Sequence, residues 1–258
     1  MVTRQDSVVS HVVHEVRPRR VEVVDVVDLT ARMRRVTLVG DLAELPVEGP
    51  TDHLKVFFPP APGAEPAEPE MGPRGLVTPP AGTGRPYREY TVRHHDGERL
   101  VIDMVRHGSG LAGRWIEDPR GALWLLGPRS SAVVAPRDWY LLGGDETALP
   151  ALARWLEVLP ADRVTVLVEI PDAGEERYLP PDAAVRWLHR DGAAPGTTTL
   201  LGDAVAGFPP PTGEGFCWMG AEASALRPVR RHLRDVLPAG CVDLDGYWRR
   251  GVAGTGLG

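Results

Sequence analysis

The stretch Arg-Pro-Tyr-Arg-Glu-Tyr-Thr-Val-Arg at positions 85–93 combines a guanidinium, an aromatic ring and a hydroxyl at close spacing. Its tyrosine, threonine and valine residues favour an extended strand, on which side chains alternate between faces. Arg88 and Tyr90 should therefore point to one side and Thr91 to the other. The guanidinium can pair with a phosphate. The phenol ring can lie on an isoalloxazine, and the Thr91 hydroxyl or amide can reach the flavin N5 edge. The alternative is an edge strand with a surface arginine and a half-buried tyrosine, since so short a motif often occurs by chance.

A second candidate is the glycine-rich segment 103–115, which follows a predicted strand and opens a predicted helix. Its three glycines would let the backbone approach a ligand closely. Free amides at the start of a helix form an anion site, so a diphosphate would fit there. Trp115 or His107 could flank an aromatic ring. The alternative is a glycine-rich turn with a core tryptophan and an ordinary histidine.

Two predicted strands in the second half of the chain end in glycine followed by acidic residues, at 143–147 and at 219–222. Ligands of α/β sheets bind beyond the carboxyl ends of strands, so both segments are candidate sites. The alternative for the first is a tight turn with an aspartate N-cap. The arginines of the helix after the second segment are typical of a solvated face. The aromatic and basic segment 246–250 could fold back over a site or simply dock by its rings.

Two kinds of element must position these candidates. Short strands rich in valine, leucine and phenylalanine recur from residue 21 to residue 135, with one short helix near 111–117, which predicts a small antiparallel barrel. After Pro136, continuous apolar strands alternate with helices, which predicts a parallel α/β domain. We therefore expect a mobile lead-in at 1–17, a barrel domain at 18–136 and an α/β domain with a C-terminal tail at 137–258. The Pro- and Gly-rich span 59–84 is predicted to be a long surface loop, partly disordered.

Composition argues against several classes of function. The chain has 258 residues, 43% hydrophobic and 25% charged, as expected for a folded globular protein. A net charge of -6 without a basic run argues against nucleic-acid binding. The sequence predicts no signal peptide and no membrane span, and hence a cytoplasmic protein. Cys217 and Cys241 are too few for an iron–sulfur cluster, so redox chemistry would need an organic cofactor. Neither a metal-ligand spacing nor a hydrolase triad is found.

In this order and spacing, these segments resemble the siderophore-interacting protein family, the flavin-dependent ferric-siderophore reductases of the ferredoxin-reductase superfamily. The resemblance extends from His53 to Trp248 and is most specific at 88–91, at 103–107 with Trp115, and at 144–150. It implies a six-stranded barrel that binds FAD, followed by a parallel α/β domain that binds NADH or NADPH. Leu111 stands where the family often has proline, which leaves the exact shape of the diphosphate turn open.

The resemblance also implies roles for individual residues. Arg88 would meet the FAD phosphates, Tyr90 would stack on the isoalloxazine and Thr91 would lie beside N5, so Tyr90 and Thr91 take the catalytic positions. The other residues that would contact the flavin are Asp103, Val105, His107, Gly110, Ala112 and Trp115. Those that would border the nicotinamide are Asp145, Glu146, Thr147 and Glu222. The basic cluster that would receive an anionic siderophore is Lys55, Arg129 and one of Arg249 or Arg250.

The predicted function is hydride transfer from NADH or NADPH to FAD, followed by single-electron reduction of Fe(III) in a ferric siderophore. Fe(II) would be released in the cytoplasm, the protein would be a monomer, and a ferredoxin is the alternative donor. A general flavin or ferredoxin-type reductase is one rival, and a non-catalytic flavin-containing siderophore carrier is another. The sequence does not distinguish NADH from NADPH or one siderophore chemistry from another.

Overall fold

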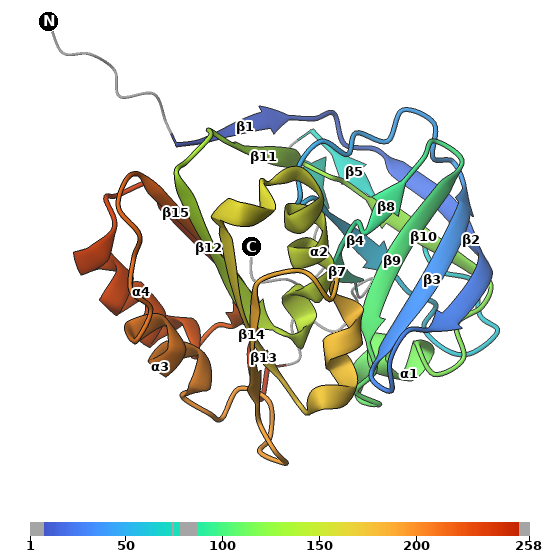
Figure 1. Cartoon of the computed structure of the whole chain (residues 1–258). Coiled ribbons are helices and arrows are strands. Elements are labelled where there is room, and N and C mark those ends of the chain that lie inside the picture. Colours follow the sequence, from blue (N-terminus) through green and yellow to red (C-terminus); the bar gives the residue numbers. More distant parts are fainter. Residues whose placement is uncertain (1–7, 74, 78–86, 253–258) are drawn as a thin grey trace, which may run out of the picture. The chain divides into compact units, whose positions relative to one another are not determined.

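The structure, a computed structural model, describes residues 8–73, 75–77 and 87–252 of the chain. It divides into two compact units (Figure 1). The barrel unit comprises Val13–Ser131, and the α/β unit comprises Ala132–Gly251 together with the residues up to Val12. The division thus falls between Ser131 and Ala132, whereas the change in sequence texture placed it near residue 136.

The barrel unit is built on one antiparallel sheet of the order β7-β4-β10-β2-β3-β9-β8. Its strands are β2 (Pro18–Asp28), β3 (Met33–Gly40), β4 (His53–Phe57), β7 (Tyr87–Thr91), β8 (His94–His95), β9 (Arg99–Val105) and β10 (Ala122–Leu126). The chain from β7 to β8 closes this sheet, because β7 pairs with β4 while β8 pairs with β9. Between them the Arg93 amide donates to the Val101 carbonyl at 2.9 Å. The sheet is therefore a closed antiparallel barrel, as the sequence predicted, and β7 and β8 form one bent strand.

Alternation of side chains explains the barrel core. Along β4 and β9 the inward set of alternate residues includes Leu54, Val56, Leu100 and Ile102, and Phe57 and Asp103 on the other face are buried as well. The short helix α1 (Gly110–Trp115) adds Ala112 to this same cluster. Because α1 is anchored in the core, the loop that leads into it has a fixed position on the barrel.

Residues 59–84 contain more structure than the predicted loop. β5 (Met71–Gly72) and β6 (Gly75–Leu76) form a two-stranded antiparallel hairpin, and Pro66 and Pro69 are buried. Composition alone hid this hairpin because its strands are only two residues long. Residues 74 and 78–84 of the predicted loop lie outside the described residues.

The α/β unit contains a five-stranded parallel sheet of the order β14-β13-β12-β15-β16. Its elements are β12 (Trp139–Asp145), η1 (Glu146–Ala148), α2 (Leu149–Val158), η2 (Ala161–Arg163), β13 (Val164–Ile170), η3 (Ala173–Tyr178), β14 (Val185–His189), α3 (Leu200–Ala206), β15 (Gly215–Glu222), α4 (Leu226–Val236) and β16 (Val242–Trp248). Helix α2 covers one face of the sheet, and α3 and α4 cover the other (Figure 1). Every residue of β12 and β15 is buried, as expected for strands covered on both sides. The predicted parallel α/β domain is confirmed.

β1 (Val9–Val13) and β11 (Ser130–Val134) pair with each other in a separate two-stranded sheet. β11 had been expected among the barrel strands, and β1 lies in the expected mobile lead-in. Backbone hydrogen bonds such as that from Ala135 N to Val8 O, 2.9 Å, order this part of the chain. Residues 1–7 of the lead-in lie outside the described residues. Among the described residues, no helix is long and apolar enough to cross a membrane.

Candidate functional site

Strand β7 places Arg88, Tyr90 and Thr91 as the alternation of a strand requires. Thr91 is buried, whereas Arg88 and Tyr90 are half-buried on the other face of the strand, which they share with the core residues Val56 and Leu54 of β4. Arg88 Nη1 donates to the Tyr87 carbonyl at 2.7 Å. Burial raises the pKa of Tyr90 and the nearby Arg88 opposes that shift, so the phenol is neutral and keeps its proton. Arg88 thus presents its positive charge beside a flat, uncharged ring.

An aromatic cluster joins β7 to α1. The Phe58 ring lies edge-on to Tyr90, with centroids 6.2 Å apart, and edge-on to Trp115, with centroids 5.2 Å apart. The indole N–H of Trp115 is buried and has no hydrogen-bond partner among the described residues. A buried donor without an acceptor is costly, so this atom fits a ligand that brings one.

The loop before α1 brings His107 to the same cluster. Partial burial and, next, Arg88 lower the pKa of His107, so its ring is neutral at neutral pH. The ring packs on the helix, because a Cβ on Gly113 would lie 2.5 Å from His107 Cε1. Gly110 has a φ of 68°, a conformation that favours glycine. The Ser109 side chain does not cap α1, since it contacts His107 Nδ1 at 3.0 Å.

These features fit the predicted FAD. Arg88 can pair with a diphosphate, and the start of α1 offers backbone amides that its preceding serine leaves uncapped. Tyr90, Trp115 and Phe58 offer aromatic surface to a flat ring system. The orphaned indole N–H offers a donor to one of the many oxygen and nitrogen acceptors of FAD.

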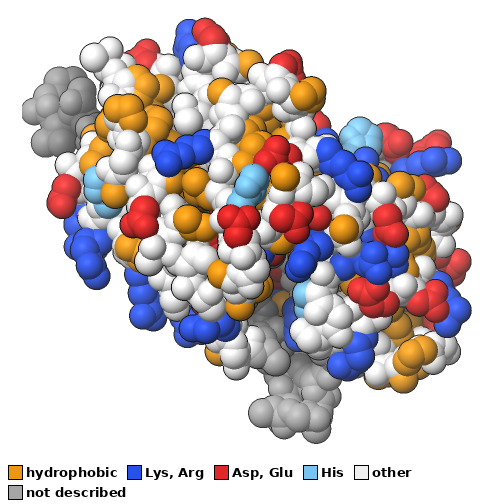
Figure 2. All heavy atoms as spheres, turned by 60° about the horizontal axis from the view of Figure 1, so that its bottom comes forward, with side chains coloured by type: hydrophobic (Ala, Val, Ile, Leu, Met, Phe, Trp, Pro, Cys, Tyr) orange, Lys and Arg blue, Asp and Glu red, His pale blue; other side chains and the backbone are white. Residues whose placement is uncertain are grey.

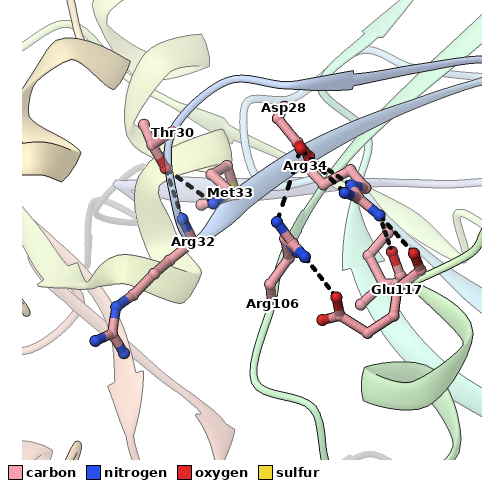
Figure 3. Close-up of polar contacts among 8 residues, drawn as sticks. Asp28, Thr30, Arg32, Met33, Arg34, Arg106 and Glu117 are labelled. Carbon is pink, nitrogen blue, oxygen red and sulfur yellow. Dashed lines mark hydrogen bonds and ion pairs between the residues drawn. The ribbon is translucent and has the colours of Figure 1, made fainter.

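A network of charged residues fixes both ends of the segment from His107 to Trp115 (Figure 3). Arg34 donates to the carbonyls of Ile116 and Glu117, at 2.7 and 2.9 Å, at the end of α1. It also forms two hydrogen bonds with Asp28, at 2.5 and 3.0 Å. Arg106, directly before His107, pairs with Glu117 at 2.5 Å. The loop of the candidate site is thus tied to the β2–β3 hairpin at each end.

Asp103 and Val105, on β9, were both expected to line the flavin. Both carboxylate oxygens of Asp103 accept from Arg35, at 2.8 and 2.7 Å, across the β3–β9 pair. The Asp103 side chain is fully buried, so its position is fixed by this ion pair. Val105 is half-buried at the end of the same strand. Arg35 was missed in the sequence because its partner is 68 residues away.

The basic residues predicted for a siderophore differ in their surroundings. Lys55 pairs with Glu89 across the β4–β7 ladder and lies 4.6 Å from the centroid of the Tyr87 ring. Its charge is therefore partly neutralised. Arg129 is exposed and lies three residues after Leu126, the cross-strand partner of Lys55. Arg249 and Arg250, in the α/β unit, are also exposed.

On the face drawn in Figure 2, basic and acidic side chains alternate rather than gather by sign. An anionic ligand on such a surface would be recognised by a few well-placed cations, because a mixed surface gives little long-range attraction.

In the α/β unit, Asp145 is a hub of hydrogen bonds at the carboxyl edge of the sheet. Its Oδ1 accepts from the amide and hydroxyl of Thr147, at 2.9 and 2.5 Å. Its Oδ2 accepts from the Glu222 amide at 2.9 Å and from the Trp248 indole at 2.8 Å. Burial and the charge of Glu146 raise the pKa of Asp145 to about 6, and the donors of Thr147 and Trp248 oppose that shift.

Glu146 is committed to a buried ion pair. Its two oxygens accept from Arg190, at 2.6 and 2.7 Å, and the Arg190 side chain is 2% exposed. Arg190 also lies 3.6 Å from Glu169, which accepts from the Thr198 hydroxyl at 2.7 Å. Neither Arg190 nor Glu169 was singled out from the sequence, since both are brought here only by the order of the strands.

Glu222 is engaged in the same way. Its Oε2 accepts from the amides of Ser224 and Ala225, at 2.5 and 2.9 Å, and its Oε1 from the Arg250 amide at 3.1 Å. A Cβ on Gly196 would lie 2.8 Å from the Glu222 side chain and 3.1 Å from Trp248, so the loop before α3 packs directly on this edge. The three acids predicted for the nicotinamide are therefore brought together, but most of their oxygens are used by the chain itself.

The two glycines of the predicted turn at 143–147 still belong to β12. A Cβ on Gly143 would lie 2.4 Å from the Leu167 carbonyl, and one on Gly144 would lie 1.9 Å from the Gly220 carbonyl. These glycines serve the close approach of neighbouring strands. The predicted N-cap is observed, because Asp145 accepts from the Thr147 amide.

Comparison with known proteins assigns both halves of the chain. Residues 22–132 match the family model of the siderophore-interacting FAD-binding domain, and residues 137–251 match that of the siderophore-interacting protein. The ferric vibriobactin reductase ViuB of Vibrio cholerae is 30% identical over 265 residues, which cover 94% of this chain and 93% of that protein.

Solved structures agree with these matches. A siderophore utilization protein from T. fusca has a TM-score of 0.88 and 42% identity, and the match covers 95% of this chain and 97% of that one. The siderophore-interacting protein SipS from Aeromonas hydrophila has a TM-score of 0.71 and 28% identity, with 92% and 93% covered. A ferredoxin reductase of carbazole 1,9a-dioxygenase, at 16% identity and a TM-score of 0.62, shares the fold, and its match covers 90% of this chain and 70% of that one.

Proposed function

The chain belongs to the siderophore-interacting protein family and carries its FAD-binding domain, and on this premise we propose that it is an FAD-dependent ferric-siderophore reductase. It takes electrons from NADH or NADPH and passes them singly to Fe(III) in a ferric siderophore, so that Fe(II) is released in the cytoplasm. The observation that carries the proposal is the cluster of Arg88, Tyr90, His107 and Trp115 beside the uncapped start of α1.

When bound, FAD accepts two electrons from a reduced nicotinamide as a hydride and gives them up one at a time, which is what two Fe(III) ions require. The neutral Tyr90 ring would lie against the isoalloxazine, and Thr91 would reach its edge through its hydroxyl or amide. Arg88 and the amides of α1 would bind the diphosphate, and Trp115 would supply its indole N–H. His107, neutral and held over Gly113, closes the same side of the site.

The chain does not need to coordinate the iron. A siderophore holds Fe(III) through hard and often anionic oxygens, and Fe(II), with its lower charge, binds such donors more weakly. The protein needs only to bring the chelate close to the flavin. Arg129 is the main cation for this task within the barrel unit, because Lys55 is already paired with Glu89. Arg249 or Arg250 supplies a second positive charge.

The carboxyl edge of the α/β sheet is the proposed site for the nicotinamide. Asp145, Glu146 and Glu222 are buried and shape this edge through their own hydrogen bonds, and Arg190 neutralises Glu146. The remaining carboxylate acceptors at this edge suit the amide and hydroxyl groups of a nicotinamide riboside, which donate hydrogen bonds, better than a phosphate. Thr147, half-buried in η1, is the fourth residue of this proposed nicotinamide site.

The test is an anaerobic absorption spectrum of the purified protein, taken before and after NADH or NADPH and again after a ferric siderophore. The proposal expects a flavin band that bleaches with the nucleotide and returns with the chelate, with two Fe(II) trapped per nucleotide oxidised. If the band bleaches only with reduced ferredoxin, the electron donor is ferredoxin rather than NADH or NADPH. A chelate that binds without any reduction would instead indicate a carrier.

The matched variants for this test are Arg88→Ala and Arg120→Ala. Arg120 is an exposed arginine of the same unit whose ion pair with Asp118 is also exposed. We expect Arg88→Ala to raise the dissociation constant for FAD by about tenfold or more, as for loss of a charge-assisted pair. Arg120→Ala should bind FAD normally. An Arg88→Ala protein that retains FAD as tightly as the control would refute the phosphate role.

A further inference from the structure

A chain of three polar side chains runs through the barrel unit away from the flavin cluster. The His14 ring nitrogen Nε2 lies 2.8 Å from Ser131 Oγ, and Ser131 Oγ lies 2.8 Å from Asp52 Oδ2. Ser131 and Asp52 are 0% and 1% exposed, and His14 is half-buried. Asp52 Oδ2 also accepts from the amides of Glu48 and Gly49, at 2.7 and 2.9 Å.

The direction of each hydrogen bond in this chain is fixed by the chemistry of its members. Ser131 Oγ donates to Asp52 Oδ2, so its single hydroxyl proton points to the carboxyl group. Ser131 Oγ must then accept from the imidazole, which places a proton on His14 Nε2. The Oδ1 atom of Asp52 is buried without a partner among the described residues, so the carboxylate is held on one side only. Loss of any link would leave a buried polar group unpaired, which is costly.

This chain of hydrogen bonds anchors the segment 127–131, which carries Arg129. The His14 amide donates to the Arg129 carbonyl at 2.9 Å, two residues before the Ser131 contact. At the other end of the segment, Leu126, directly before Gly127, is held in the barrel by its pairing with Lys55 of β4 and Pro18 of β2. The segment is thus held at both ends and in its middle, while the Arg129 side chain itself is exposed.

Asp52 links this anchor to the strand that carries Lys55. It directly precedes β4, and its carbonyl accepts from the Val92 amide at 2.8 Å, next to the end of β7. The register pairs Lys55 with Leu126, the residue just before the anchored segment. Asp52 therefore links the Arg129 segment, through its carboxylate, to β4, which it directly precedes, and to the end of β7, through its backbone carbonyl.

We propose that His14, Ser131 and Asp52 are positioning residues that fix Arg129 for an anionic chelate and so set the preference of the enzyme for anionic over neutral ferric siderophores. This inference rests on the proposed function. An exposed arginine on a loose segment would lose side-chain and backbone entropy on binding, and a pre-ordered segment avoids most of the backbone part of that cost. A neutral chelate gains nothing from the placement of Arg129.

The test compares Ser131→Ala and His14→Leu with Ser130→Ala and His94→Leu, which change neighbouring or exposed residues outside the chain of hydrogen bonds. His14→Gln is the conservative variant, since its amide can still donate to Ser131. Affinity of each FAD-loaded protein is measured by calorimetry for a triply anionic ferric tris(catecholate) and for a neutral ferric trihydroxamate. Steady-state kinetics with both chelates give KM and kcat.

We expect Ser131→Ala and His14→Leu to weaken binding of the anionic chelate by about tenfold and to raise its KM alike, with kcat and FAD content retained. The neutral chelate should bind as before, and His14→Gln should restore affinity for the anionic one. Equal weakening for both chelates, or no change for either, would overturn the inference. Wild-type protein that binds no anionic chelate would overturn it too. If the wild-type protein binds the anionic chelate but does not reduce its iron, only the proposed function is refuted. The calorimetric affinities of the variants would still test whether His14 and Ser131 position Arg129.

Discussion

At the scale of single residues, the barrel unit contains a buried donor that has no acceptor among the described residues. The indole N–H of Trp115 lies in the cluster of Phe58, Tyr90 and Trp115. An unpaired buried donor costs roughly 1–3 kcal/mol, which a protein tolerates where a ligand supplies the missing acceptor. The indole N–H groups of Trp139 and Trp155, in the α/β unit, are also buried and without a partner in the described part of the chain, so Trp115 supports the proposed cofactor site only together with the aromatic cluster around it.

Trp115→Phe should separate the two roles of this residue. Phenylalanine keeps the aromatic contact and removes the N–H, so the protein without FAD should be unchanged or about 1 kcal/mol more stable. Affinity for FAD should fall by about tenfold, as for one lost hydrogen bond in a buried site. Chemical denaturation and flavin fluorescence measure the two quantities. Unchanged FAD affinity would mean that the N–H does not meet the cofactor.

Trp248 offers a second residue-scale prediction, in the α/β unit. Its indole donates to Asp145, so Trp248→Phe should leave the Asp145 carboxylate with one donor fewer and raise its pKa further. The midpoint of proton uptake near pH 6 should therefore move to higher pH, and we expect KM for the nicotinamide to rise while FAD affinity is retained. NMR titration of a carbon-labelled Asp145 carboxyl measures the change in its pKa. Trp187→Phe, on the edge strand β14, is the control.

At the scale of elements, the geometry of the flavin site depends on α1 and on what holds it. A helix of six residues has too few internal hydrogen bonds to be stable alone. Ala112 and Ile116 anchor it in the barrel core, and Arg34 binds the carbonyls at its end. The β2–β3 hairpin that carries Arg34 is itself fixed by Thr30, whose hydroxyl accepts from the Met33 amide at 2.9 Å (Figure 3).

Arg34→Ala should therefore loosen the site although Arg34 is no part of it. Without its guanidinium, the carbonyls of Ile116 and Glu117 lose their donors, and amide exchange across 107–117 should become faster. We expect FAD affinity to fall by about tenfold, with Arg120→Ala as the matched control. Hydrogen exchange read by mass spectrometry gives the first result and flavin fluorescence the second. Exchange at the control rate would show that the core contacts of α1 suffice.

The same charged network also predicts the response of the site to acid. Arg34 and then Arg106 lower the pKa of Asp28, and Arg106 lowers that of Glu117. Their folded-state pKa values thus lie below their unfolded ones, so their contribution is present near neutral pH and is lost as pH falls through the folded values. FAD should dissociate more readily below about pH 4 than the stability of the core alone would require. An Arg34→Ala variant should lose most of the Asp28 part of this step, whereas the part from Glu117, which pairs with Arg106, should remain.

At the scale of the whole molecule, each of the two units has its own hydrophobic core. The α/β unit holds two carboxyls that respond to pH in the opposite sense to Asp28. Burial and Glu146 raise the pKa of Asp145 to about 6. Burial and Asp245 raise that of Asp243 to about 6, while His11 opposes the shift. Folding of this unit should therefore bind protons between about pH 4 and pH 6, and its stability should decline as pH rises through that window.

Asp243→Asn tests this decline without touching the Asp145 hub. The variant removes a charge that is unfavourable in the folded state above about pH 6, so it should stabilise the protein there by about 1–2 kcal/mol after allowance for solvent screening. It should have little effect near pH 4, where the folded-state carboxyl is already protonated. Calorimetric unfolding across pH gives both values. A constant effect at all pH values would mean that Asp243 does not titrate in this window.

The sequence by itself determined the two kinds of element, their order along the chain and the strand that carries Arg88, Tyr90 and Thr91. The alternation of apolar residues can be seen in neighbouring positions of the sequence, and so can the placement of Arg88 and Tyr90 on one face of this strand and Thr91 on the other. Strand pairing decided the rest. Asp103 was paired with Arg35, Glu146 with Arg190, Asp52 with Ser131, and Ser131 with His14, each across 44 to 117 residues. Only the tertiary structure brings such partners together, because a buried charge selects its partner by position in space rather than by distance along the chain.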